Sequence, residues 1–169
     1  NPLPHMLPRP ELFSGAVNQL GVQSGARVVV YDGKGLFSAP RAWWMFRAFG
    51  HDSVHILEGG FPGWRASGGA VTKALPDVGN STEPFLPVYQ PDWIVDLEDV
   101  KEHLRSGTGL VVDARSPARF FGIERDPRPG VREGHIPGSK NLHYSSLLEG
   151  VPTVLDGGRL EGFRSALSC

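Results

Sequence analysis

The sequence has a single cysteine, Cys169, among its 169 residues, and almost no net charge. One cysteine excludes an internal disulfide and any metal site built from several cysteines. Lys plus Arg number 17 and Asp plus Glu number 18, so a formal charge of -1 gives no net positive field for a nucleic-acid backbone. No uncharged apolar run is long enough to cross a bilayer, and residues 1–10 are rich in proline instead of resembling a signal peptide. We therefore expect no signal peptide, no membrane anchor and no nucleic-acid partner.

The composition is typical of a folded chain. Hydrophobic residues make up 40% and charged residues 21%, which is close to the average for globular domains. The length allows one ordinary domain or two smaller pieces. The 22 glycines and 15 prolines fall mostly between periodic segments, a pattern that favours short alternating elements joined by tight turns.

The first part of the chain reads as alternating helices and strands. Pro10 begins a helical pattern, and residues 39–49 form a second one whose apolar residues lie nearly all round the helix. Val28–Val30 is a β-branched run without alternation, which predicts a strand covered on both faces, and residues 54–57 predict another strand. Strands separated by helices imply parallel pairing.

A change in composition predicts a domain boundary. Residues 70–92 are rich in proline and weakly periodic, as in a semi-stiff linker, so we expect one domain in residues 1–69 and another in 93–169. In the second part we predict a strand at residues 93–95, a helix capped by Asp96, and a buried strand at residues 110–112.

The loop that follows the last of these strands is unusually rich in arginine. It contains Arg115, Arg119, Arg125, Arg128 and Arg132, and a His-Ile-Pro-Gly turn closes it. A planar guanidinium binds a carboxylate or another oxyanion through two parallel N–H donors. The loop is therefore a candidate anion site.

Two long stretches resemble the two-domain rhodanese-type sulfurtransferases of the thiosulfate and 3-mercaptopyruvate class. The first resembles the later half of that family's non-catalytic domain, and the second resembles the early half of its catalytic domain. The residues that carry the resemblance are 28–33 (VVVYDG), 38–47 (SAPRAWWMFR), 50–51 (GH), 112–115 (VDAR), 119–120 (RF), 126–130 (DPRPG) and 134–138 (GHIPG).

The resemblance implies an α/β fold with a rhodanese-like parallel sheet flanked by helices, in two incomplete tandem units. Residues 1–69 would be the second half of a non-catalytic domain, residues 70–92 the interdomain linker, and residues 93–169 the first half of a catalytic domain. Such incomplete units could also pair their strands across the linker or with a second copy of the chain.

The resemblance also implies a reaction. Sulfur would move from thiosulfate or 3-mercaptopyruvate to a cysteine, as a persulfide, and then to cyanide or a thiol acceptor. Arg119 and Arg128 match the arginines that bind the anionic donor, although pairing with Asp113, Glu124 or Asp126 would instead tie the loop down. No metal or organic cofactor is implied, because the thiolate does the chemistry. Residence in mitochondria or cytoplasm is expected.

Cys169 is the candidate nucleophile, and a second interpretation stays open for it. A reactive thiolate is stabilised by backbone N–H groups that follow it, and this sequence has none after Cys169, which favours an inert terminal cysteine for the chain as given. We accordingly expect little turnover from these residues alone.

Asp32 stands where a nucleophile would be in the first domain. A carboxylate cannot carry sulfane sulfur, so we expect Asp32 to cap the following helix or to bind loop N–H groups.

Other roles are less favoured by the sequence. His135 could act as a general base, but its His-Ile-Pro-Gly context indicates a structural turn. Arg115, Arg125 and Arg132 are interpreted as structural or solvated. Two rivals to the enzyme are a catalytically silent rhodanese-like module for binding or regulation, and a phosphatase, for which the arginine-containing loop after the cysteine is missing.

Overall fold

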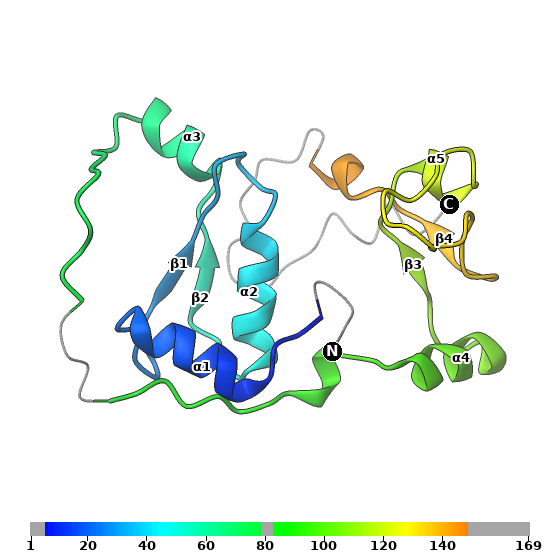
Figure 1. Ribbon diagram of the computed structural model, residues 1–169, viewed down its shortest axis with the longest axis horizontal. Helices are drawn as coiled ribbons and strands as arrows, with labels where there is room; N and C mark the ends of the chain where they lie inside the picture. The colour runs from blue at the N-terminus through cyan, green and yellow to red at the C-terminus, as the bar shows by residue number, and fades with distance from the viewer. Residues whose placement is uncertain (1–5, 79–82, 149–169) are drawn as a thin grey trace. The chain divides into compact units, whose positions relative to one another are not determined.

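The computed structural model describes residues 6–78 and 83–148 (Figure 1). They form two compact units that meet in the sequence between Ile94 and Val95. Unit 1 comprises the described residues up to Ile94, and unit 2 those from Val95 onward. In this part of the chain no helix has the length and apolar character needed to cross a membrane.

Unit 1 alternates helices and strands, as predicted. Its elements are α1 (Pro10–Gln19), β1 (Val28–Val30), α2 (Ala39–Ala48), β2 (Val54–Ile56), α3 (Gly60–Ala66) and a 3-10 helix, η1 (Pro91–Trp93). The two strands pair in parallel, with Val28 opposite Val54 and Val30 opposite Ile56, so the expectation of parallel pairing is confirmed. Helix α2 forms the crossover between them and lies alongside the pair (Figure 1).

Aromatic rings form the core of unit 1. Phe13 of α1 stacks on Phe49 at 4.7 Å between ring centroids and meets the edge of Phe46 at 5.1 Å. Val17 and Val54 complete the buried cluster from α1 and β2. Burial of these large apolar side chains is the main stabilisation of the unit.

The prediction that β1 is covered on both faces is wrong. Val28 and Val30 pack against the core, but Val29, between them, is 52% exposed. Side chains of a strand alternate between its faces, and α2 covers only one face of this strand pair. On the other face Val29 lines an open hollow of about 390 Å³ with, among others, Tyr31, Phe61 and Trp64.

Part of the segment expected as a linker packs against unit 1. Phe85 is 2% exposed and meets the edge of Phe13 at 5.8 Å. The side-chain amide of Asn18 accepts from the Phe85 N–H and donates to the Phe85 carbonyl. Further along, the Val88 N–H donates to the carbonyl of Phe49, just after α2, and the Gln90 N–H donates to the carbonyl of Ala48, the last residue of α2. Residues 83–90 thus belong to the fold of unit 1.

Unit 2 is smaller. It contains α4 (Leu97–Ser106), β3 (Val112–Asp113), α5 (Pro117–Phe120), β4 (Lys140–Asn141) and a second 3-10 helix, η2 (Tyr144–Leu147). Strands β3 and β4 pair in parallel, with Val112 opposite Lys140. The predicted cap of α4 is confirmed, because the Asp96 carboxylate accepts from the N–H groups of Glu98 and Asp99.

The predicted strand at residues 93–95 is wrong. Pro91 begins the 3-10 turn η1, which ends at Trp93, and no described strand pairs with the residues that follow.

Candidate anion-binding site

The site lies in unit 2, in the loop between β3 and β4. At the start of this loop the Ser116 hydroxyl accepts from the Arg119 N–H at 3.4 Å, and Pro117 occupies the first position of α5. Serine before proline is a favourable start for a helix, because the hydroxyl satisfies an N–H that has no helical partner. This places Arg119 in the single turn of α5.

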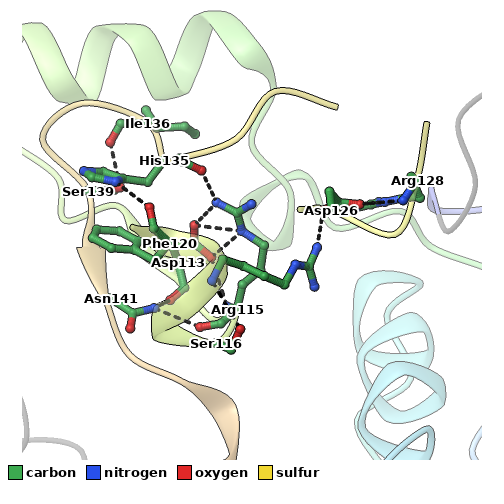
Figure 2. A network of polar contacts seen from close by, with 12 residues as sticks. Asp113, Arg115, Ser116, Phe120, Asp126, Arg128, His135, Ile136, Ser139 and Asn141 are labelled. Carbon is green, nitrogen blue, oxygen red and sulfur yellow. Dashed lines mark hydrogen bonds and ion pairs between the residues drawn. The ribbon is translucent and has the colours of Figure 1, made fainter. Parts of the chain in front are cut away.

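Asp113 and Arg115 form the base of the loop (Figure 2). Arg115 Nε lies 3.0 Å from both carboxylate oxygens of Asp113, and Arg115 Nη2 lies 2.5 Å from Oδ2. The hydrogen bond from Arg115 lowers the pKa of Asp113, and the same bond raises the pKa of Arg115. Arg115 also donates to the Gly134 carbonyl at 2.7 Å, which ties the two ends of the loop together.

Two further contacts hold the ends of this loop. The Asn141 side-chain amide of β4 donates to the carbonyls of Asp113 and Arg115, both at 2.9 Å. His135 donates through Nδ1 to the Phe120 carbonyl at 2.8 Å, and its ring stacks on that of Phe120 at 3.7 Å between centroids. These contacts fit the interpretation of Arg115 and His135 as structural residues.

Asp126 brings the two candidate donor-binding arginines together. Its side chain is 1% exposed and forms ion pairs with Arg119 and Arg128. Arg128 Nε lies 2.9 Å from Oδ1 and Nη2 lies 3.2 Å from Oδ2, while the Arg128 N–H donates to Oδ1 at 3.0 Å (Figure 2). Arg119 Nη2 donates to Oδ2.

The electrostatics of this cluster follow from those contacts. Hydrogen bonds from the Arg128 side chain and then its backbone N–H, with a further contribution from Arg119, hold the pKa of Asp126 far below its usual range. The bond to Asp126 raises the pKa of Arg128. Two guanidinium groups and one carboxylate leave the cluster with one net positive charge.

The two arginines differ in exposure. The side chain of Arg128 is 55% exposed and that of Arg119 is 22% exposed. Arg119 Nε is buried and has no hydrogen-bond partner among the described residues. The exposed part of Arg128 can therefore offer N–H donors and a positive charge to an anion from solution, whereas Arg119 Nε is closed to solvent. Arg125, by contrast, is 91% exposed and pairs with Glu133.

In unit 1, Asp32 binds loop N–H groups, as the sequence predicted. Its Oδ2 accepts from the N–H groups of Phe37, Ser38 and Ala39 at 2.6 to 3.0 Å, and Oδ1 accepts from Lys34 at 2.8 Å. Burial alone would raise the pKa of Asp32, but these four bonds outweigh it and lower the pKa to about 2. The carboxylate thus lies at the N-terminus of α2, and the N-terminus of a helix favours negative charge.

Comparison with known proteins relates this architecture to a family. Residues 4–67 match the family model described as the rhodanese-like domain. Thiosulfate/3-mercaptopyruvate sulfurtransferase 1, mitochondrial, of Arabidopsis thaliana is 41% identical over 178 residues, covering 94% of this chain and 47% of that protein. The 3-mercaptopyruvate sulfurtransferase of Homo sapiens is 42% identical over 154 residues, covering 88% of this chain and 50% of the human protein.

A solved structure gives the same result. SseA, a 3-mercaptopyruvate sulfotransferase from Escherichia coli, has a TM-score of 0.74 and 40% sequence identity over 87% of this chain and 54% of its own. This chain is a homologue of the rhodanese-type sulfurtransferases. The predicted resemblance and the predicted rhodanese-like fold, with parallel strands flanked by helices, are confirmed. The rhodanese-like chain spans about half the length of the curated relatives it matches.

The structure describes only some of the site residues that the sequence predicted. Arg119 and Arg128 are brought together by Asp126, which is one of the partners named in the alternative interpretation that they tie the loop down. Cys169 lies outside the described residues. In the part of the rhodanese-like chain that the structure describes, no group of three His, Cys, Asp or Glu residues could hold a metal ion.

The sequence interpretation missed two features of this site. It considered Asp126 only as one of several possible ion-pair partners, and it did not mention Asn141. The Asp-Pro-Arg spacing of residues 126–128 was a usable signal, because a carboxylate two residues before an arginine can accept from that residue's N–H.

Proposed function

We propose that the protein containing this chain is a sulfurtransferase that moves sulfane sulfur from thiosulfate or 3-mercaptopyruvate to cyanide or a thiol acceptor. The observation that carries the proposal is the pair of guanidinium groups, Arg119 and Arg128, that meet at Asp126 in a chain 41% identical to a thiosulfate/3-mercaptopyruvate sulfurtransferase. Both donors are anions, and paired guanidinium groups are well suited to bind them.

The proposed nucleophile is the Cys169 thiolate. It attacks the outer sulfur of thiosulfate, the S–S bond breaks, and sulfite leaves with the bonding electrons. With 3-mercaptopyruvate the C–S bond breaks instead, and the enolate of pyruvate leaves and takes a proton from water. In either case a persulfide remains on the cysteine, and cyanide or a thiolate then attacks its terminal sulfur and regenerates the thiolate.

The arginines act on the donor in this scheme. They bind its carboxylate or oxyanion, hold its sulfur in a fixed direction, and stabilise the negative charge on the departing sulfite or enolate. No redox cofactor is needed, because the electron pair that the donor keeps when its bond to sulfur breaks is balanced by the pair that the acceptor gives to the transferred sulfur.

Thiocyanate formation by the whole protein that contains this chain tests this function. The unsubstituted protein, supplied with cyanide and either donor, is expected to produce thiocyanate. Arg128→Lys keeps the charge but loses the fork of donors, so it should lower kcat/KM about tenfold, corresponding to about 1.4 kcal/mol. Arg132→Lys, the matched exchange at an exposed residue of the same loop, should leave kcat/KM within about twofold. Absence of turnover in the unsubstituted protein would refute the proposal.

We also propose mitochondrial or cytoplasmic residence and self-association. The printed name of one plant relative includes the word mitochondrial, which supports the first. The second is supported by the short strand pairs of the two units, each with two described strands. Light scattering over a range of concentrations tests self-association, and a mass that stays monomeric throughout would contradict it.

A further inference from the structure

The buried carboxylate of Asp126 has an unusual set of partners. Both of its oxygens accept from guanidinium groups, and Oδ1 also accepts from the Arg128 N–H at 3.0 Å. Its side chain is only 1% exposed, so these partners, and not bulk water, satisfy the carboxylate oxygens. Asp126 therefore occupies the centre of the cluster and presents little of itself to solvent.

Asp126 offsets the repulsion between the guanidinium groups of Arg119 and Arg128. Arg119 comes from α5 and Arg128 from the loop after it, and two guanidinium groups close together repel each other. A carboxylate between them offsets this repulsion and fixes both side chains by hydrogen bonds. Arg128 is held at Nε and Nη2, a two-point contact that defines the plane of its guanidinium.

Asp126 also determines the net charge available to a ligand. Without it the two arginines would carry two positive charges, and with it the cluster carries one. A monoanionic carboxylate such as that of 3-mercaptopyruvate neutralises one positive charge, whereas thiosulfate brings two negative charges. The contacts of Asp126 therefore favour the monoanion, since a dianion would leave an uncompensated charge beside a buried carboxylate.

We propose that Asp126 is a positioning residue that orients Arg119 and Arg128 and biases the site toward the monoanionic carboxylate of 3-mercaptopyruvate over dianionic thiosulfate. This inference rests on the proposed function, because it assumes that the two arginines bind the sulfur donor. Asp126 itself does not contact the donor. It acts through the two arginines.

The test compares the two donors in the whole protein that contains this chain. Asp126→Asn keeps the shape of the side chain and removes its charge. The KM for 3-mercaptopyruvate should rise about tenfold or more, while the KM for thiosulfate should change less or fall. The ratio of kcat/KM for 3-mercaptopyruvate to that for thiosulfate should therefore drop at least fivefold. Asp126→Glu, which restores the charge, should recover part of the ratio.

Glu133→Gln is the matched control. It removes the same charge from the same loop, at a residue that pairs with exposed Arg125, and should leave the donor ratio unchanged. If Asp126→Asn prevented folding, kcat/KM would fall equally for both donors. Asp126→Glu would then give the donor ratio in a folded protein. An unchanged ratio in Asp126→Asn and in Asp126→Glu would overturn the proposal. Absence of turnover with both donors in the unsubstituted protein would instead refute the proposed function.

Discussion

Asp32 and Asp126 are both shielded carboxylates, but they are stabilised by different means. Asp126 is held by two charged side chains, and Asp32 by four backbone N–H groups of its own loop. A backbone N–H group carries no formal charge, so the negative charge of Asp32 is dispersed and not neutralised. Asp32 serves the fold of its loop, whereas Asp126 keeps two cations together for use by a ligand.

Replacing Asp32 by asparagine should give a stability loss that depends on pH. The pKa of Asp32 is lowered to about 2 in the fold, compared with about 3.9 in an unfolded chain. The carboxylate therefore stabilises the fold fully above about pH 4, and this contribution disappears as the pH falls through about 2. Urea unfolding should show a large difference between the unsubstituted protein and Asp32→Asn at pH 7, and a smaller one below pH 4.

The exposed Asp77 supplies the control for that experiment. Asp77→Asn removes the same charge without removing the four loop bonds, so it should change the free energy of unfolding little at any pH. A difference for Asp32→Asn that is constant from pH 7 to pH 3 would show that ionisation of this group does not stabilise the loop.

Among the elements, helix α4 is stabilised largely by contacts between its own residues and those of its N-terminal cap. None of its residues is buried, and its first turn is closed by a capping box in which Asp96 and Asp99 each bind the other's backbone. Two ion pairs along its exposed side, Glu98 with Lys101 and Glu102 with Arg105, add little. Local interactions therefore supply much of the stability of this helix.

Asp96→Ala should destabilise unit 2 by about 1 kcal/mol, because two N–H groups lose their acceptor. Glu102→Ala removes one exposed ion pair and should cost only a few tenths of a kcal/mol. Urea titrations followed by circular dichroism at 222 nm compare the two variants. Equal losses for both would show that the cap contributes no more than a surface pair.

Helix α4 and the residues around it show which features could be predicted from the sequence. The Asp96 cap depends on neighbouring residues and was predicted correctly. The strand predicted at residues 93–95 needed a distant partner for its ladder, and Pro91 instead begins the 3-10 turn η1. The meeting of Arg119 with Asp126 likewise depends on the path of the loop between them, which no local pattern specifies. Residue types at the site and the local contact of Asp126 with Arg128 were predictable, but the pairing of Arg119 with Asp126 was not.

At the scale of the whole molecule, unit 1 is completed by residues far along the chain. Phe85 enters a core built from α1, α2 and β2. Asn18 binds the N–H and carbonyl of Phe85 itself, and Ser24 binds the backbone of the residues on either side of it. Residues 71–78, which precede this segment, are exposed and form no helix or strand. The contacts of residues 83–90 should therefore hold without an intact chain through 71–78.

A cleavage site for a sequence-specific protease placed between Lys73 and Ala74 tests this. After cutting, the two pieces should elute together in size-exclusion chromatography. Phe85→Ala removes a buried ring, at a cost of about 3 to 5 kcal/mol, and should release the pieces. Leu86→Ala, at a neighbouring side chain that is 67% exposed, should not. Separation of the pieces without any substitution would contradict the structural role of residues 83–90.

The contact between Asn18 and Phe85 has a chemical consequence. The amide of Asn18 imitates a peptide group, accepting from the Phe85 N–H at 2.6 Å and donating to its carbonyl at 3.4 Å. Deamidation, a slow hydrolysis that occurs as proteins age, would convert this amide into a carboxylate, which has no hydrogen to donate. A carboxylate oxygen would then face the Phe85 carbonyl oxygen, and the two would repel. Asn18 is thus a position at which spontaneous chemical damage would loosen the anchoring of a distant segment.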